Sequence, residues 1–199
     1  MKNNKISRMV QLAVLLGIVI FLQCFFAQIV VGTTSFSVVL VPIVVGAILL
    51  GPGAGALLGF VFGAVVLIYG ITGQDVFTNM LFVAQPGFTA LICLGKGTAA
   101  GFLAGLVYQL IAKRNAFWAS VAAAAIAPIA NTGLFILGGL TLVRGTLEAN
   151  LSTFGADSVL IFLVVFCAGI NFIVEFGVNM ILAPAIYRII TVVKKSLTR

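Results

Sequence analysis

Five polar side chains interrupt the apolar stretches of this sequence and could bind a small solute. Lys96 and Glu175 are the two ionisable residues that lie clearly inside such stretches. Asn171 and Asn179 flank Glu175 at four-residue spacing, which places the three side chains on one face of a helix. Asn131 adds another carboxamide in a neighbouring stretch. Because ionisable residues inside a membrane are costly and mark functional sites by default, these residues form the candidate solute-binding set.

The positions of Lys96 and Glu175 along their stretches indicate comparable depths in a membrane. Counted from the outer end of each predicted helix, Lys96 lies about ten residues in and Glu175 about 16, or roughly 15 and 24 Å at ~1.5 Å per residue. Two interpretations fit this placement. The residues form a solute site, or a Lys–Glu pair and the asparagines hold the helices together. Clustering on three helices in the outer and middle membrane favours the site.

The other reactive residues predict no catalytic, metal or nucleotide site. The sequence has no histidine, and Cys24, Cys93 and Cys167 show no Cys-x-x-Cys spacing. Residues 95–98 (Gly-Lys-Gly-Thr) resemble the end of a phosphate-binding loop, but Ala90 stands where the first glycine is required. Paired carboxylates and a nucleophile–base arrangement are also missing. We therefore expect no enzyme activity, cofactor or metal, and the energy for any uphill transport must come from elsewhere.

The composition requires lipid as the solvent of these helices. Charged residues make up only 8% of the chain and hydrophobic residues 62%, whereas a soluble domain carries about 25% charged residues. The fold class is therefore an all-α membrane protein with a single integral membrane domain over residues 1–199. Stretches long enough to span predict a bundle of six transmembrane helices, at about 8–31, 36–50, 54–71, 86–112, 117–140 and 159–190. Residues 76–85 are a weaker apolar stretch that we interpret as a partly embedded loop, and residues 141–158 are predicted to form a polar loop.

The basic residues determine the expected orientation. Lys and Arg concentrate in cytoplasmic segments of membrane proteins. With the N-terminus inside, nine of the eleven basic residues lie on the cytoplasmic side, and only Arg144 lies outside. Both termini are therefore predicted to be cytoplasmic. The nine are Lys2, Lys5, Arg8, Lys113, Arg114, Arg188, Lys194, Lys195 and Arg199.

Small residues recur at four-residue spacing in several predicted spans. They allow helix backbones to approach closely in lipid. In the third and fourth spans we expect them to pack the bundle. In the first span, Ala13 and Gly17 could instead face an external partner helix. The two packing series are Gly51, Gly55, Gly59 and Gly63, followed by Gly97, Gly101 and Gly105.

Residues 38–63 carry a family resemblance that extends over nearly the whole chain. Pro42 in the second span, the Leu-Gly-Pro-x-x-Gly pattern at residues 50–55 and the glycine-rich third span resemble the substrate-binding S component of an energy-coupling factor (ECF) vitamin transporter. The resemblance implies six spans and cytoplasmic termini in a bacterial plasma membrane. It also implies a transmembrane scaffold subunit and two ATPase subunits as partners. Ala13 and Gly17 match the scaffold-contacting Ala-x-x-x-Ala pattern, with glycine in place of the second alanine.

Within this family the polar residues of the last two spans look most like the pantothenate branch. The resemblance implies that Lys96 pairs with the pantothenate carboxylate and that Arg144 attracts anions to the mouth of the site. Asn131, Asn171 and Asn179 would bond the amide and hydroxyl groups, and Glu175 would accept from a hydroxyl. Pyridoxine is an alternative vitamin that suits Glu175 and the asparagines but leaves Lys96 without a role.

A different class of transporter stays open. A stand-alone secondary transporter could couple solute movement to protons or sodium through Glu175. Such transporters usually contain inverted repeats and broken helices near the midplane. The sequence shows no convincing internal repeat, which favours the S-component interpretation.

Overall fold

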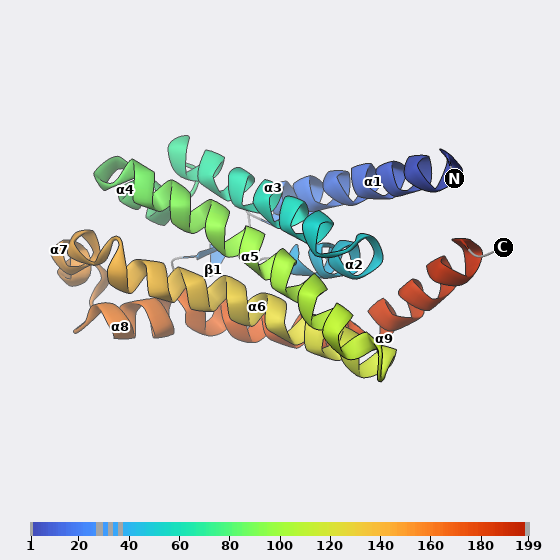
Figure 1. Cartoon of the computed structure of the whole chain (residues 1–199). Coiled ribbons are helices and arrows are strands. Elements are labelled where there is room, and N and C mark those ends of the chain that lie inside the picture. The colour runs from blue at the N-terminus through green and yellow to red at the C-terminus, as the bar shows by residue number, and fades with distance from the viewer. Residues whose placement is uncertain (1, 27–29, 32–33, 36–37, 198–199) are drawn as a thin grey trace.

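The computed structural model describes residues 2–26, 30–31, 34–35 and 38–197, and this part of the chain is almost entirely helical (Figure 1). This confirms the all-α prediction. The long helices are α1 (Lys2–Phe26), α3 (Pro52–Ile71), α5 (Pro86–Ala112), α6 (Ala116–Thr141) and α9 (Ile170–Leu197). The shorter ones are α2 (Leu40–Leu50), α4 (Val76–Ala84), α7 (Arg144–Phe154), α8 (Val159–Ile161) and the π-helical segment η1 (Phe162–Gly169). Two two-residue strands, β1 (Val30–Val31) and β2 (Thr34–Ser35), pair antiparallel.

Five helices in the described residues are long and apolar enough to cross a membrane. The segment expected as a second span contains α2, whose 11 residues rise about 16 Å and cannot cross a ~30 Å hydrocarbon layer alone. Residues 36 and 37 of that expected span lie outside the described part. The last expected span is divided into α8, η1 and α9. The five candidate spans are Lys5–Phe25, Pro52–Ile71, Pro86–Ala112, Ala116–Thr141 and Asn171–Val193.

Two segments expected to lack regular structure are helical. Asp75 caps α4, because its side chain accepts a hydrogen bond from the backbone N–H of Thr78 at 2.9 Å. The prediction of a polar loop at 141–158 is wrong, because α7 occupies the centre of this segment. The helix is terminated by Gly155 in the left-handed conformation (φ 63°). Polar residues dominate α7, so a search of the sequence for apolar stretches does not find this helix. Leu147 nevertheless packs into the core and orders the segment.

Glycines bring the backbones of α3 and α5 into direct contact. A Cβ at Gly59 would meet the carbonyl of Gly97, and a Cβ at Gly101 would meet the carbonyl of Gly55. Only glycine fits at these crossings, which confirms that the small residues of these two helices pack the bundle. Gly17 on α1 differs, because a Cβ there would meet nothing within 4 Å.

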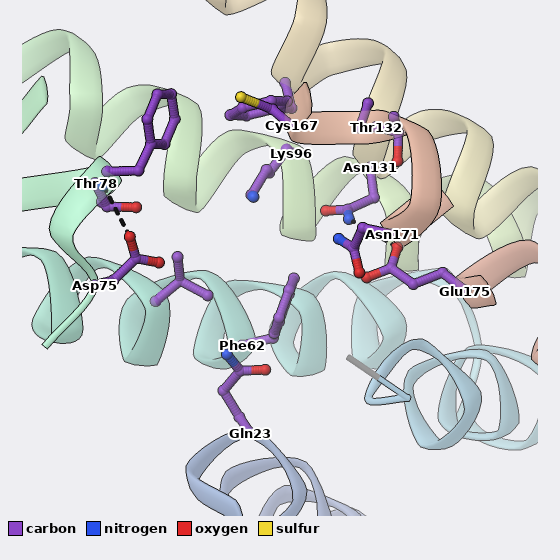
Figure 2. Close-up of a pocket in the computed structure, with 14 residues that line it drawn as sticks. Gln23, Phe62, Asp75, Thr78, Lys96, Asn131, Thr132, Cys167, Asn171 and Glu175 are labelled. Atoms are coloured by element: carbon purple, nitrogen blue, oxygen red, sulfur yellow. Dashed lines mark hydrogen bonds between the residues drawn. The ribbon is translucent and has the colours of Figure 1, made fainter. Parts of the chain in front are cut away.

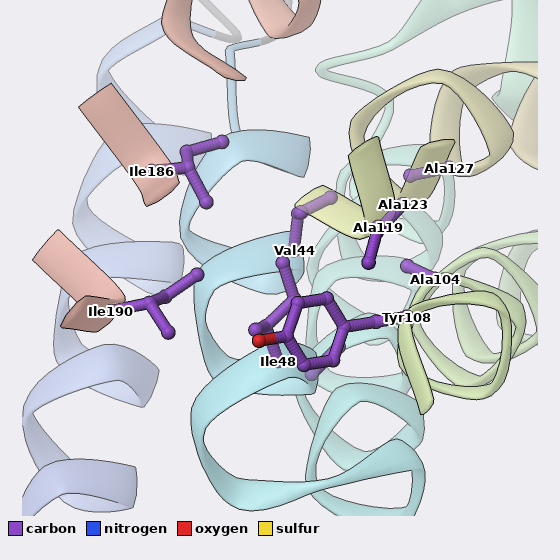
Figure 3. Packing of buried hydrophobic residues seen from close by; sticks show 10 residues of the cluster. Val44, Ile48, Ala104, Tyr108, Ala119, Ala123, Ala127, Ile186 and Ile190 are labelled. Carbon is purple, nitrogen blue, oxygen red and sulfur yellow. The ribbon is translucent and has the colours of Figure 1, made fainter. Parts of the chain in front are cut away.

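Apolar clusters fill both ends of the bundle. The cluster nearer the chain termini joins α2, α5, α6 and α9, where Tyr108 and Val44 pack against small alanines of α6 and against Ile186 and Ile190 (Figure 3). The cluster at the opposite end joins α4, α5, α6, α7, α8 and η1 around the ring of Phe162. These clusters hold the helices whose polar residues face one another between them.

The beginning of α1 and the end of α9 lie at the same end of the bundle, and α4, α7 and α8 lie at the other end (Figure 1). This arrangement agrees with two termini on one side of a membrane. Which side they face stays a prediction from the distribution of basic residues.

Candidate functional site

A polar pocket lies inside the bundle. Its lining includes Phe77 and Thr78 of α4, which lies at the end of the bundle away from the chain termini (Figure 1). Every long helix contributes to it, together with α4 and η1. Its wall combines aromatic and aliphatic surfaces with amides, two carboxylates and one amine. The lining residues are Gln23, Phe62, Val66, Asp75, Phe77, Thr78, Lys96, Asn131, Thr132, Phe135, Cys167, Ala168, Asn171 and Glu175.

Glu175 is the most deeply buried charged residue of the pocket, with 1% of its surface exposed. The Nδ2 of Asn131 donates a long hydrogen bond of 3.5 Å to its Oε2. The side chain of Asn171, one turn earlier on the chain, also interacts with the Glu175 carboxylate. The Nδ2 of Asn179 donates instead to the backbone carbonyl of Glu175 at 2.8 Å. Carboxamides on α6 and α9 therefore surround this carboxylate.

Lys96 extends from α5 into the pocket, between Asp75 on one side and Glu175 on the other (Figure 2). Its Nζ lies 5.1 Å from the centroid of the Phe135 ring, within the range of a cation–π contact. No ion pair joins Lys96 to Glu175, since the described residues contain a single salt bridge, elsewhere on α7. The ammonium group is therefore available to a negatively charged or hydrogen-bond-accepting ligand.

Gln23 and Asp75 line the pocket, although sequence reasoning did not select them. Asp75 lies in the turn before α4 (Figure 2). One carboxylate oxygen caps the helix by accepting from the N–H of Thr78, and the second oxygen takes no part in this cap. The sequence feature that could have selected Asp75 is an acidic residue directly beside a predicted span. Gln23 comes from α1 and is 2% exposed. A lone glutamine in an apolar stretch carries no spacing signal, so only the fold reveals it.

The structure places four of the sequence-selected residues in the pocket and others outside it. Lys96, Asn131, Asn171 and Glu175 line the pocket. Asn179 is fully buried beside it but is not part of its wall.

Arg144 lies on α7, where its Nε forms an exposed salt bridge of 2.7 Å with Glu148. It does not contribute to the pocket wall either. Ala13 and Gly17 lie on the exposed surface of α1.

Binding is the chemistry that this arrangement supports. Within the described ranges, no three His, Cys, Asp or Glu residues gather as metal ligands. Apolar and aromatic walls with a few convergent polar groups are typical of small-molecule sites. The mixture of an amine, carboxylates and amides suits a polar solute that carries both hydrogen-bond donors and acceptors.

Comparison with known families gives one match. The sequence model of the family described as "ECF transporter, substrate-specific component" matches residues 7–187, which is nearly the whole chain. Comparison with curated proteins finds no match. The extent of the family match includes all five candidate spans except the first residues of the first and the last residues of the fifth. The chain therefore belongs to the family of ECF transporter substrate-specific components.

Proposed function

We propose that this substrate-specific component captures pantothenate in the Lys96–Glu175 pocket with high affinity, as the substrate-binding subunit of an ECF-type ABC importer in a bacterial plasma membrane. One observation carries the proposal. A pocket inside the helix bundle holds the amine of Lys96, which has no ion-pair partner among the described residues, beside buried amide oxygens. Family membership supports the transport role, and the pocket chemistry supports a water-soluble vitamin as the solute.

The polar wall matches the functional groups of pantothenate. Its carboxylate pairs with Lys96, which has no acidic partner within ion-pair distance in the described residues. The Oδ1 atoms of Asn131 and Asn171 are buried without a hydrogen-bond partner. Leaving such an atom unpaired costs about 1–3 kcal/mol, so the amide N–H and hydroxyl groups of the vitamin would satisfy them. Asn179 supports this wall indirectly, by bonding the backbone at Glu175.

Pyridoxine is the second candidate, and a specific feature favours it. Phe62, Phe77 and Phe135 all line the pocket and offer ring surfaces to a planar aromatic ligand. Asp75 and Glu175 also outnumber Lys96, which favours a neutral ligand rich in hydroxyl groups. Pantothenate has no ring, so these residues would contact only its aliphatic part.

The exposed face of α1 supports the proposed partner contact. Ala13 and Gly17 are exposed, and no atom lies within 4 Å of a Cβ placed at Gly17. A helix of the transmembrane scaffold subunit could therefore approach the α1 backbone closely. The scaffold would connect this chain to two ATPase subunits. The proposed attraction of anions by Arg144 has weaker support, because Glu148 neutralises its charge.

A ligand screen on the purified protein tests the proposed substrate. Isothermal calorimetry and thermal shift would compare pantothenate, pyridoxine and the other B vitamins. The proposal predicts a dissociation constant for pantothenate well below ~10 μM, which corresponds to about 7 kcal/mol. Tighter binding of pyridoxine would transfer the assignment to the second candidate. Failure of every vitamin to bind below that limit would refute the vitamin-binding function.

A further inference from the structure

The carboxamide of Gln23 is buried in a place that the pantothenate contacts above do not use. It is 2% exposed, and its Oε1 has no hydrogen-bond partner among the residues that the structure describes. Figure 2 shows the side chain extending from α1 toward the pocket that it lines. A buried polar atom without a partner is unfavourable. A ligand in the pocket would supply the missing hydrogen bond.

Helix α1 buries a smaller share of its residues in the bundle than the other candidate spans do. Only 11% of its most apolar window is buried, compared with 39% for the windows of α5 and α6. Among its described side chains from Lys5 to Phe25, only Val19 and Gln23 are buried. Both residues lie in the half of α1 nearer the pocket. A ligand contact at Gln23 would therefore add to the packing that holds this half of the helix.

The polar contacts of α1 differ between its two ends. At the end near the chain termini, the Nη2 of Arg8 donates a hydrogen bond of 2.8 Å to the backbone carbonyl of Leu50, which ties α1 to α2. At the pocket end, Cys24 contacts the hydroxyl of Tyr69 on α3, and a thiol forms only weak hydrogen bonds. Among the described residues at this end of α1, Gln23 is the one whose buried carboxamide could make a strong polar contact with a ligand.

We propose that the bound solute hydrogen-bonds Gln23 and thereby fixes the pocket end of α1 against the bundle. The proposal rests on the proposed function and extends it to regulation. Ala13 and Gly17 lie on the same helix, about ten and six residues from Gln23, or ~15 and ~9 Å along the helix axis. Occupancy of the pocket therefore alters the mobility of the surface that would face the scaffold.

Hydrogen exchange combined with calorimetry tests this coupling on the full chain. The test variant is Gln23→Leu, and the matched control is Gln11→Leu, a half-buried glutamine of the same helix that does not line the pocket. Pantothenate is the probe, used at saturating concentration for each variant. Gln23→Leu is expected to weaken binding about three- to tenfold, the effect of one hydrogen bond. The control is expected to bind like the wild type.

The exchange of α1 peptides separates coupling from affinity. Saturating pantothenate is expected to slow exchange in α6, α9 and the pocket half of α1 in the wild type and in Gln11→Leu. In Gln23→Leu, the slowing should persist in α6 and α9 and disappear in α1. Gln23→Ala provides the same comparison if the leucine variant does not fold.

The possible outcomes distinguish this proposal from the proposed function. Equal slowing of α1 in the wild type and in the Gln23 variants would overturn the coupling alone. Unchanged affinity in both Gln23 variants would also overturn it, with pantothenate binding intact. A wild-type protein that binds no vitamin refutes the proposed function and the coupling together.

Discussion

Replacing Gly59 with alanine tests the close approach of α3 and α5 on which the pocket depends. A Cβ at this position would meet the carbonyl group of Gly97, and the backbone nitrogen of Thr98 would lie 3.1 Å away. Backbone atoms cannot rotate aside, so the two helices must separate. Overpacking in a well-packed core typically costs about 1–3 kcal/mol, and a rigid backbone contact places this variant at ~3 kcal/mol. The better helix propensity of alanine offsets up to ~1 kcal/mol of this.

Gly53→Ala is the matched control on the same helix. A Cβ there would meet nothing within 4 Å. The free energy of unfolding, measured by reversible titration of purified protein with a denaturing detergent, should fall by about 2 kcal/mol for Gly59→Ala. The control should be unchanged or up to ~1 kcal/mol more stable. Equal stability of the two variants would refute the direct backbone contact between α3 and α5.

Four further predictions concern single side chains. Lys96→Met should weaken the binding of pantothenate about 10- to 100-fold, because the carboxylate loses its charged partner. The binding of panthenol, the neutral alcohol analogue, should weaken less than about threefold. Equal losses of affinity in calorimetry would show that Lys96 stabilises the fold instead. Arg144→Met should change pantothenate affinity less than about twofold, because its pair with Glu148 is exposed. Gly17→Leu should preserve vitamin binding but reduce co-purification with the scaffold subunit, and unchanged co-purification would move the contact away from this face. Asp75→Ala should lower the free energy of unfolding by ~1 kcal/mol through loss of the α4 cap, and an unchanged value would contradict the capping role.

Local sequence signals were sufficient for much of the architecture. Pro86 begins α5 because its fixed φ suits the first helical turn, and the charged turn at residues 113–115 ends it. The rarity of ionisable residues in apolar helices was enough to select Lys96 and Glu175, which the fold brings to one pocket. Family membership and the apolar helices make this chain a multi-pass membrane protein and a transporter subunit rather than an enzyme.

The remaining features depend on tertiary packing and carry little local signal. The length of α2 could not be predicted, because an apolar stretch looks the same whether or not all of it is helical. The helix α7 is polar, and Leu147 orders it only through contacts with other elements. Gln23 reaches the site because α1 packs beside α3. Sequence periodicity describes a single helix and does not predict which helices pack together. Lys96 and Glu175 were expected at similar depths. That they form no ion pair in the described residues could be learned only from the three-dimensional structure.

Uptake of labelled pantothenate into vesicles tests the central claim most directly. Vesicles would contain this chain alone, this chain with its scaffold and ATPase subunits, or the full assembly with Lys96→Met. A substrate-specific component predicts uptake only with the full wild-type assembly and ATP inside, and a large loss in the Lys96 variant. Uptake by this chain alone, driven by a proton or sodium gradient and abolished by Glu175→Gln, would contradict the account and identify an ion-coupled transporter.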